Sequence, residues 1–170
     1  MRVALAIVVP LVAALLQGSV VPFISIAGSR PNLVLLAAAS WAVAAGAREA
    51  VWWAFLGGLA ADLLSGGPLG ATAFAALIPV AAVGLHDDPL RPRSVVIGAP
   101  LVGVASLAAG VLYVVILAMA GTAVGDFPLL VASAVSTGIY NGALAIATYP
   151  LARMVRRATE KQASFTRSAW

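Results

Sequence analysis

The sequence predicts an all-α integral membrane protein, a bundle of six transmembrane helices with both ends of the chain in the cytoplasm. Of the 170 residues, 62% are hydrophobic and only 9% are charged, whereas about a quarter of the residues in a soluble domain are charged. A spanning helix needs about 20 residues, so the chain has room for about six spans with short connections. The apolar runs are continuous and rich in Ala, Leu and Val, which disfavours a transmembrane β-barrel with its alternating pattern.

Apolar segments, separated by Gly, Pro and charged residues, place the six spans along the chain. We expect the first to be retained, because it is long for a signal peptide, lacks an Ala-x-Ala-like site and precedes five more spans. Pro31 suits the first turn of the second span, and Arg48 with Glu49 is expected to form the tight turn before the third. Pro100 predicts a tilt or kink in the fifth span, and Asp126 is a candidate N-cap for the sixth. The expected spans cover about residues 3–21, 31–47, 50–65, 71–85, 94–120 and 128–151.

The basic residues predict the orientation in the membrane. With six spans and a cytoplasmic N-terminus, Arg30 is the only one of the ten Lys and Arg residues on the outer side. The other nine lie on the cytoplasmic side, as the positive-inside rule requires. The sequence therefore predicts a transmembrane domain over residues 1–152 and a basic cytoplasmic tail over 153–170. The tail would lie against anionic lipid, and the basic composition does not indicate nucleic-acid binding.

Ionisable side chains are scarce within the spans, and this argues against an enzyme. Asp62, near the end of the third span, is a buried carboxylate for a partner, an ion or a proton, or an interfacial residue that is hydrated or caps the following loop. The chain has no cysteine and one histidine, His86, whose polar loop lacks the ligand spacing of a metal site. No serine has a histidine or lysine partner for nucleophilic catalysis. We expect no enzyme activity, metal or cofactor.

Small residues recur every four positions on three spans, which lets helix backbones approach closely in lipid. We expect two of these faces to pack inside the bundle and one to receive a helix from a partner. Asn141, in the sixth span, should hydrogen-bond a neighbouring helix, at about 0.5–2 kcal/mol. The small faces comprise Ala38, Ala42 and Gly46; Gly57, Ala61 and Ser65; and Gly138 and Gly142.

The order of these features resembles the MreD family, the small membrane subunit of the bacterial rod-shape (elongation) machinery. The most specific part is the run DLLSGGPLG at residues 62–70. The resemblance covers about residues 3–157. The family commonly has Pro-Asp-Leu where this chain has Pro31-Asn32-Leu33, so the polar group is kept without its charge. The remaining residues that carry the resemblance are Gly57-Gly58-Leu59, Asn141, Pro150 and the basic stretch 153–157.

The resemblance implies a non-enzymatic scaffold of the bacterial cytoplasmic membrane that organises peptidoglycan synthesis. Its partners would be an MreC-like protein and, through it, a penicillin-binding transpeptidase, a RodA-type glycosyltransferase and the actin-like MreB. The residues expected to form its structural or partner-binding core are Pro31, Asn32, Asp62, Ser65, Gly66, Pro68, Gly70 and Asn141.

The resemblance also implies a bundle similar to the substrate-binding subunit of energy-coupling-factor transporters. The alternative function is therefore a small-molecule-binding membrane subunit of a transporter, with a polar cavity near the outer face. The sequence offers few polar groups to line such a cavity, which favours the scaffold. An enzyme acting on lipid-linked precursors would need at least two positioned ionisable groups, and Asp62 is the one candidate.

Overall fold

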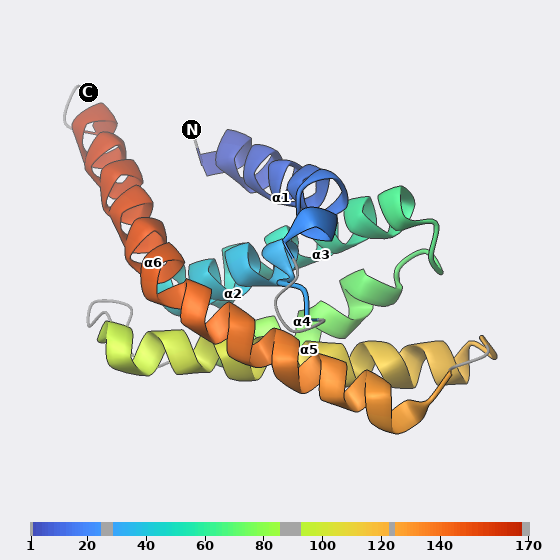
Figure 1. Cartoon of the computed structure of the whole chain (residues 1–170). Coiled ribbons are helices and arrows are strands. Elements are labelled where there is room, and N and C mark those ends of the chain that lie inside the picture. Colours follow the sequence, from blue (N-terminus) through green and yellow to red (C-terminus); the bar gives the residue numbers. More distant parts are fainter. Residues whose placement is uncertain (1, 25–28, 86–92, 123–124, 168–170) are drawn as a thin grey trace.

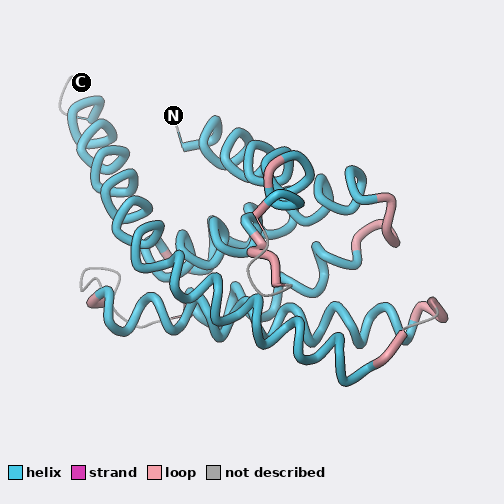
Figure 2. Tube along the Cα trace, viewed as in Figure 1, coloured by secondary structure: helices cyan, strands magenta, loops and turns pink. Residues whose placement is uncertain are grey.

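The computed structural model describes residues 2–24, 29–85, 93–122 and 125–167, without the side chains of residues 2, 3 and 161–167. Helices joined by short loops make up this part of the chain (Figures 1 and 2). The predicted loop over residues 86–93, apart from Arg93, lies outside the described residues. The helices are α1 (Arg2–Ser19), the 3-10 helix η1 (Val21–Phe23), α2 (Leu33–Ala45), α3 (Ala47–Ser65), α4 (Ala71–Gly84), α5 (Val95–Met119) and α6 (Phe127–Arg167).

The helices differ in their ability to cross a membrane. Two are long and apolar enough by themselves: α5, with 25 residues, and the stretch Phe127–Glu160 of α6, with 34. The shortest α-helices in the described part of the chain are α2 and α4, with 13 and 14 residues. At 1.5 Å per residue they reach only about 20 Å, against a hydrocarbon core about 30 Å thick. The predicted all-helical class is confirmed, and the length of the elements within it is uneven.

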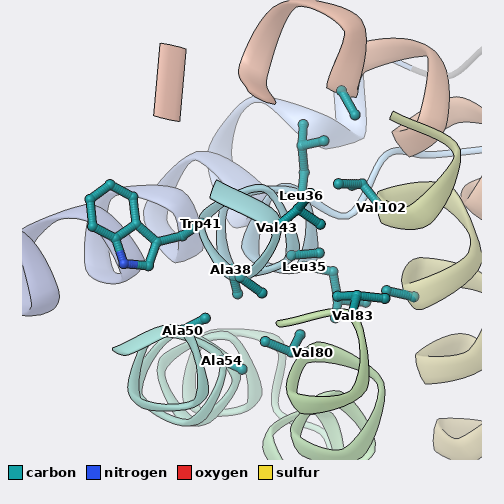
Figure 3. Close-up of a cluster of buried hydrophobic side chains, with 14 of the residues drawn as sticks. Leu35, Leu36, Ala38, Trp41, Val43, Ala50, Ala54, Val80, Val83 and Val102 are labelled. Carbon is teal, nitrogen blue, oxygen red and sulfur yellow. The ribbon is translucent and has the colours of Figure 1, made fainter. Parts of the chain in front are cut away.

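The short helix α2 lies at the centre of the bundle and contacts α1, α3, α4, α5 and α6. A helix that is apolar on all sides is stable only when neighbours surround it, and ten of its thirteen residues are buried. Figure 3 shows its side chains meeting Ala54 of α3, Val80 of α4 and Val102 of α5. The rings of Trp41 and Trp53 stack with centroids 4.5 Å apart.

Glycines allow two pairs of helices to approach closely. In the α3–α4 hairpin, a Cβ on Gly58 would lie 2.6 Å from Cα of Ala73, and one on Gly84 would lie 2.6 Å from Cα of Ala47. The α5–α6 pair, which lies side by side in Figure 1, meets at Gly103, where a Cβ would lie 2.9 Å from the carbonyl oxygen of Gly138. At these glycines the backbones of the two helices pack directly against each other, because no side chain lies between them.

The three predicted small-residue faces take part in this packing. Ala38 and Ala42 of α2 are buried. On α3, a Cβ on Gly57 would lie 2.7 Å from Val34. The face on α6 packs against α5 at Gly138 and continues to Gly142, which also borders a groove on the outer surface of the bundle.

Two predicted boundaries are wrong. The reversal between α2 and α3 occurs at Gly46, whose φ of 100° favours glycine. Arg48 and Glu49 therefore lie in the first turn of α3, where a negative charge suits the positive end of the helix dipole. Pro31 precedes α2 instead of starting it, since Asn32 is the N-cap.

The helix α6 continues past Leu151, where the sixth span is expected to end, as far as Arg167. The residues beyond Pro150 are mostly good helix formers, and Arg156 pairs with Glu160 one turn later at 2.8 Å. The helix changes direction along its course in Figure 1. Pro150 lies inside it, and proline favours a bend because it removes one helical hydrogen bond.

Candidate functional site

The start of α2 is a buried polar junction. The first N–H groups of a helix have no partner within the helix, and here side chains supply the acceptors. Asn32 accepts a hydrogen bond from the Leu35 amide through Oδ1 at 3.0 Å. Gln17, near the end of α1, accepts from the Leu33 amide at 2.7 Å and donates to the Pro31 carbonyl at 3.2 Å. The N-cap residue Asn32 and Gln17 of α1 therefore together hold the first turn of α2 in place.

Asn141 joins this junction to α5 and α6. Its Nδ2 donates to the Asn32 carbonyl at 3.0 Å and to Ser106 Oγ at 2.9 Å, while its Oδ1 accepts from the Asn32 amide at 3.1 Å. The side chain is fully buried. The predicted hydrogen bond from Asn141 to a neighbouring helix is present, and one carboxamide satisfies both backbone groups of Asn32.

The departure from the family's Pro-Asp-Leu pattern has a structural explanation. The capping interaction uses one side-chain oxygen of Asn32, and Asn caps helices about as well as Asp does. The charge is therefore not needed for this hydrogen bond.

Asp62, near the end of α3, caps the start of α4 in the way that Asn32 caps the start of α2. Its two carboxylate oxygens lie 3.3 and 3.1 Å from the amide nitrogen of Thr72, which donates to them. The N-cap residue itself is Gly70, which has no side chain to do this. Asp62 is 2% exposed, and its charge lies at the favourable end of the α4 dipole. This geometry is that of the capping alternative left open by the sequence.

The residues between α3 and α4 fold back on Asp62. Ser65 donates its hydroxyl to the Asp62 carbonyl at 3.3 Å, and the Gly66 amide donates to the same carbonyl at 3.2 Å. Gly66 and Gly70 have φ values of 69° and 90°, a region that L side chains rarely adopt. The Pro68 carbonyl accepts from the Ala71 amide at 3.1 Å, so this run of the sequence builds one turn.

A cavity of about 350 Å³ lies between the α2 junction and the Asp62 turn. Its walls come from the C-terminal parts of α1, α3 and α5 and from the N-terminal parts of α2, α4 and α6. The expectation that few polar groups are present to line a cavity is wrong, because isolated hydroxyls in apolar helices give almost no sequence signal. The polar side chains on its walls are Gln17, Asn32, Ser65, Thr72, Ser106, Tyr113, Ser133 and Thr137.

Basic residues pack at the end of the bundle where α2 finishes, opposite the cavity. Arg156 donates to the Ala44 carbonyl near the C-terminus of α2, where a cation suits the helix dipole. Tyr149 donates its hydroxyl to the Arg93 carbonyl at 2.7 Å, and the guanidinium of Arg153 lies 5.7 Å from the centroid of the Tyr149 ring. These arginines therefore contribute to packing as well as to the charge of this end.

A groove of about 410 Å³ opens on the surface of the α5–α6 pair. Its lining is apolar and includes small residues that let another backbone approach. Proline has no N–H, so Pro100 leaves the carbonyl of Val96 without its helical donor. The lining consists of Val95, Val96, Ala99, Pro100, Gly142, Ala143 and Ile146.

These features define the class of protein. The bundle has two long apolar helices, large apolar side chains exposed on most helices, and polar groups gathered inside. It is a helical membrane protein.

The chain matches a known protein family over most of its length. The family model for the rod shape-determining protein MreD matches residues 1–158, so the chain belongs to the MreD family and is a rod shape-determining membrane protein. No curated protein and no solved structure matches it. The match does not support the transporter alternative.

Proposed function

We propose that the protein is a non-enzymatic scaffold of the rod complex that binds the single transmembrane helix of an MreC-like partner. The groove of the α5–α6 pair carries this proposal. Val96 and Ala143 are exposed there, where lipid would otherwise cover them. Small residues favour helix association in lipid, and the carbonyl of Val96 offers a hydrogen bond to a polar group of the partner.

The same proposal includes six membrane passes with both termini in the cytoplasm. Arg93, Arg153 and Arg156 gather at one end of the bundle, which the positive-inside rule assigns to the cytoplasm. Irregular backbone is tolerated at membrane depth only where protein satisfies it. The junction before α2 meets this condition, which supports a short second pass enclosed by the other helices.

Further partners follow from this arrangement. The MreC-like protein would connect the scaffold to a penicillin-binding transpeptidase and a RodA-type glycosyltransferase. MreB would approach from the cytoplasmic side, where the basic end of α6 also meets anionic lipid. In this role the protein contributes positions and surfaces to peptidoglycan synthesis instead of chemistry.

The test is affinity purification of the tagged protein from its native membrane in mild detergent, with mass spectrometry of the proteins recovered. We expect an MreC-like protein together with cell-wall synthases. An Ala143→Trp variant should lose the partner because the indole fills the groove. Ala82→Trp, at an exposed alanine of α4 outside the groove, is the matched control. Recovery of ATPase and coupling subunits instead would contradict the scaffold proposal.

A further inference from the structure

The cavity between the α2 junction and the Asp62 turn has the features of a ligand site that the scaffold function does not use. Its volume of about 350 Å³ falls at the small end of the range of ligand pockets, roughly 300–1,000 Å³. It lies in the half of the bundle opposite the basic end. None of the residues that line the α5–α6 groove lines it, so the two sites are separate.

Hydrogen-bond donors in the cavity lack acceptors among the described residues. Ser106 is 0% exposed and accepts from Asn141, but its own hydroxyl proton has no acceptor in the described part of the chain. The Tyr113 hydroxyl and the Nδ2 group of Asn32 likewise bond to no other described residue. Ser106 is buried, whereas Tyr113 and Asn32 are half-buried. A buried polar group without a partner costs about 1–3 kcal/mol, and such groups normally have a protein, water or ligand partner.

The charges around the cavity favour a neutral ligand. Among the described lining residues, none carries a formal charge. An anion would lie close to the carboxylate of Asp62, which accepts from the amide of Thr72 in the cavity wall. The helix dipoles at the cavity oppose one another, since α2, α4 and α6 present N-terminal parts and α1, α3 and α5 present C-terminal parts. The unpaired groups are donors, and a cation offers them no acceptor. An uncharged group avoids the repulsion from Asp62, and its oxygens can accept hydrogen bonds from the unpaired donors.

We propose that this cavity binds an uncharged sugar or amide group, whose oxygens accept hydrogen bonds from Ser106, Tyr113 and Asn32. Apolar residues such as Leu35, Val114 and Leu130 form the rest of the wall and would contact the carbon skeleton. Two sources present this chemistry: the head group of a neutral glycolipid and a free solute. The site requires no partner in the α5–α6 groove, so its test is separate from that of the scaffold function.

The experiment uses the full chain in phosphatidylcholine nanodiscs. Saturation-transfer NMR measures the binding of free N-acetylglucosamine, and native mass spectrometry measures retention of glucosyl diacylglycerol included in the disc. Saturable binding of either probe supports the site: the free sugar indicates a solute, and the glycolipid alone indicates a head group. Absence of saturable binding of both probes would overturn the proposal.

Two variants test the donors. Tyr113→Phe and Ser106→Ala each remove one hydroxyl and should weaken binding by about 3–10-fold, the loss of roughly one hydrogen bond. Tyr113→Phe removes no hydrogen bond between described residues, so its fold should be unchanged. Tyr140→Phe, a tyrosine that does not line the cavity, is the matched control and should bind as the wild type does. Unchanged affinity in both cavity variants would contradict the assignment.

Discussion

Replacing Asn141 tests how far the junction before α2 determines the stability of the bundle. The side chain makes three hydrogen bonds, two to the backbone of Asn32 and one to Ser106. Hydrogen bonds between membrane helices contribute about 0.6–1.7 kcal/mol each. Their combined loss should therefore lower the free energy of unfolding by about 2–5 kcal/mol.

The informative variant is Asn141→Leu, which keeps most of the side-chain volume and removes the polar atoms. Reversible unfolding in mixed micelles with increasing SDS gives the free energy of unfolding. Ser136→Ala is the control on the same helix, since its hydroxyl bonds only to the Ala132 carbonyl of α6 at 2.9 Å. We expect the control to change stability by less than about 0.5 kcal/mol. A loss below about 1 kcal/mol for Asn141→Leu would refute the importance of the junction.

Three further predictions use the same unfolding assay. Asp62→Ala should lower the free energy of unfolding by about 0.5–2 kcal/mol through loss of the α4 cap. Asp62→Asn should keep most of the stability, and cells that carry it should keep normal rod shape. An Asn variant as defective as the Ala variant would indicate a role for the charge instead. Asn32→Asp should stay near wild type and Asn32→Ala should lose about 1 kcal/mol, because capping needs only the oxygen; equal losses would contradict this. Gly58→Ala should cost about 1–3 kcal/mol through its clash with Ala73. The control is Gly18→Ala, which has nothing within 4 Å of the new Cβ and should raise the free energy of unfolding by about 0.5–1 kcal/mol. A gain in stability for Gly58→Ala would show that the α3–α4 hairpin relaxes around the new side chain.

Much of the fold could be predicted from the sequence because apolar runs and their Gly and Pro boundaries report local structure. The six α-helices fall where these runs lie. The turn between α2 and α3 was misplaced because charged residues signal a loop more visibly than Gly46 does. The continuation of α6 beyond the expected span could not be predicted, because basic residues mark the end of a span and are also good helix formers.

The polar interior was harder to predict. Asn141 and Asp62 are conspicuous as polar residues within apolar segments, but their partners are backbone groups of distant segments, 109 residues apart for Asn141 and Asn32. No local pattern encodes such a contact. Ser106 and Tyr113 face the cavity only because the short α2 begins inside the bundle, which is a property of the tertiary packing.

If the α5–α6 groove holds the transmembrane helix of the partner, site-specific photo-crosslinking in growing cells should capture that helix. A photoreactive benzoylphenylalanine is introduced in place of Ala143, in the groove, and in a second strain in place of Ala82, outside it. We predict a crosslinked adduct with an MreC-like single-span protein from position 143 and none from position 82. An adduct from position 82 alone, or only lipid and no protein at position 143, would contradict binding of the partner in the groove.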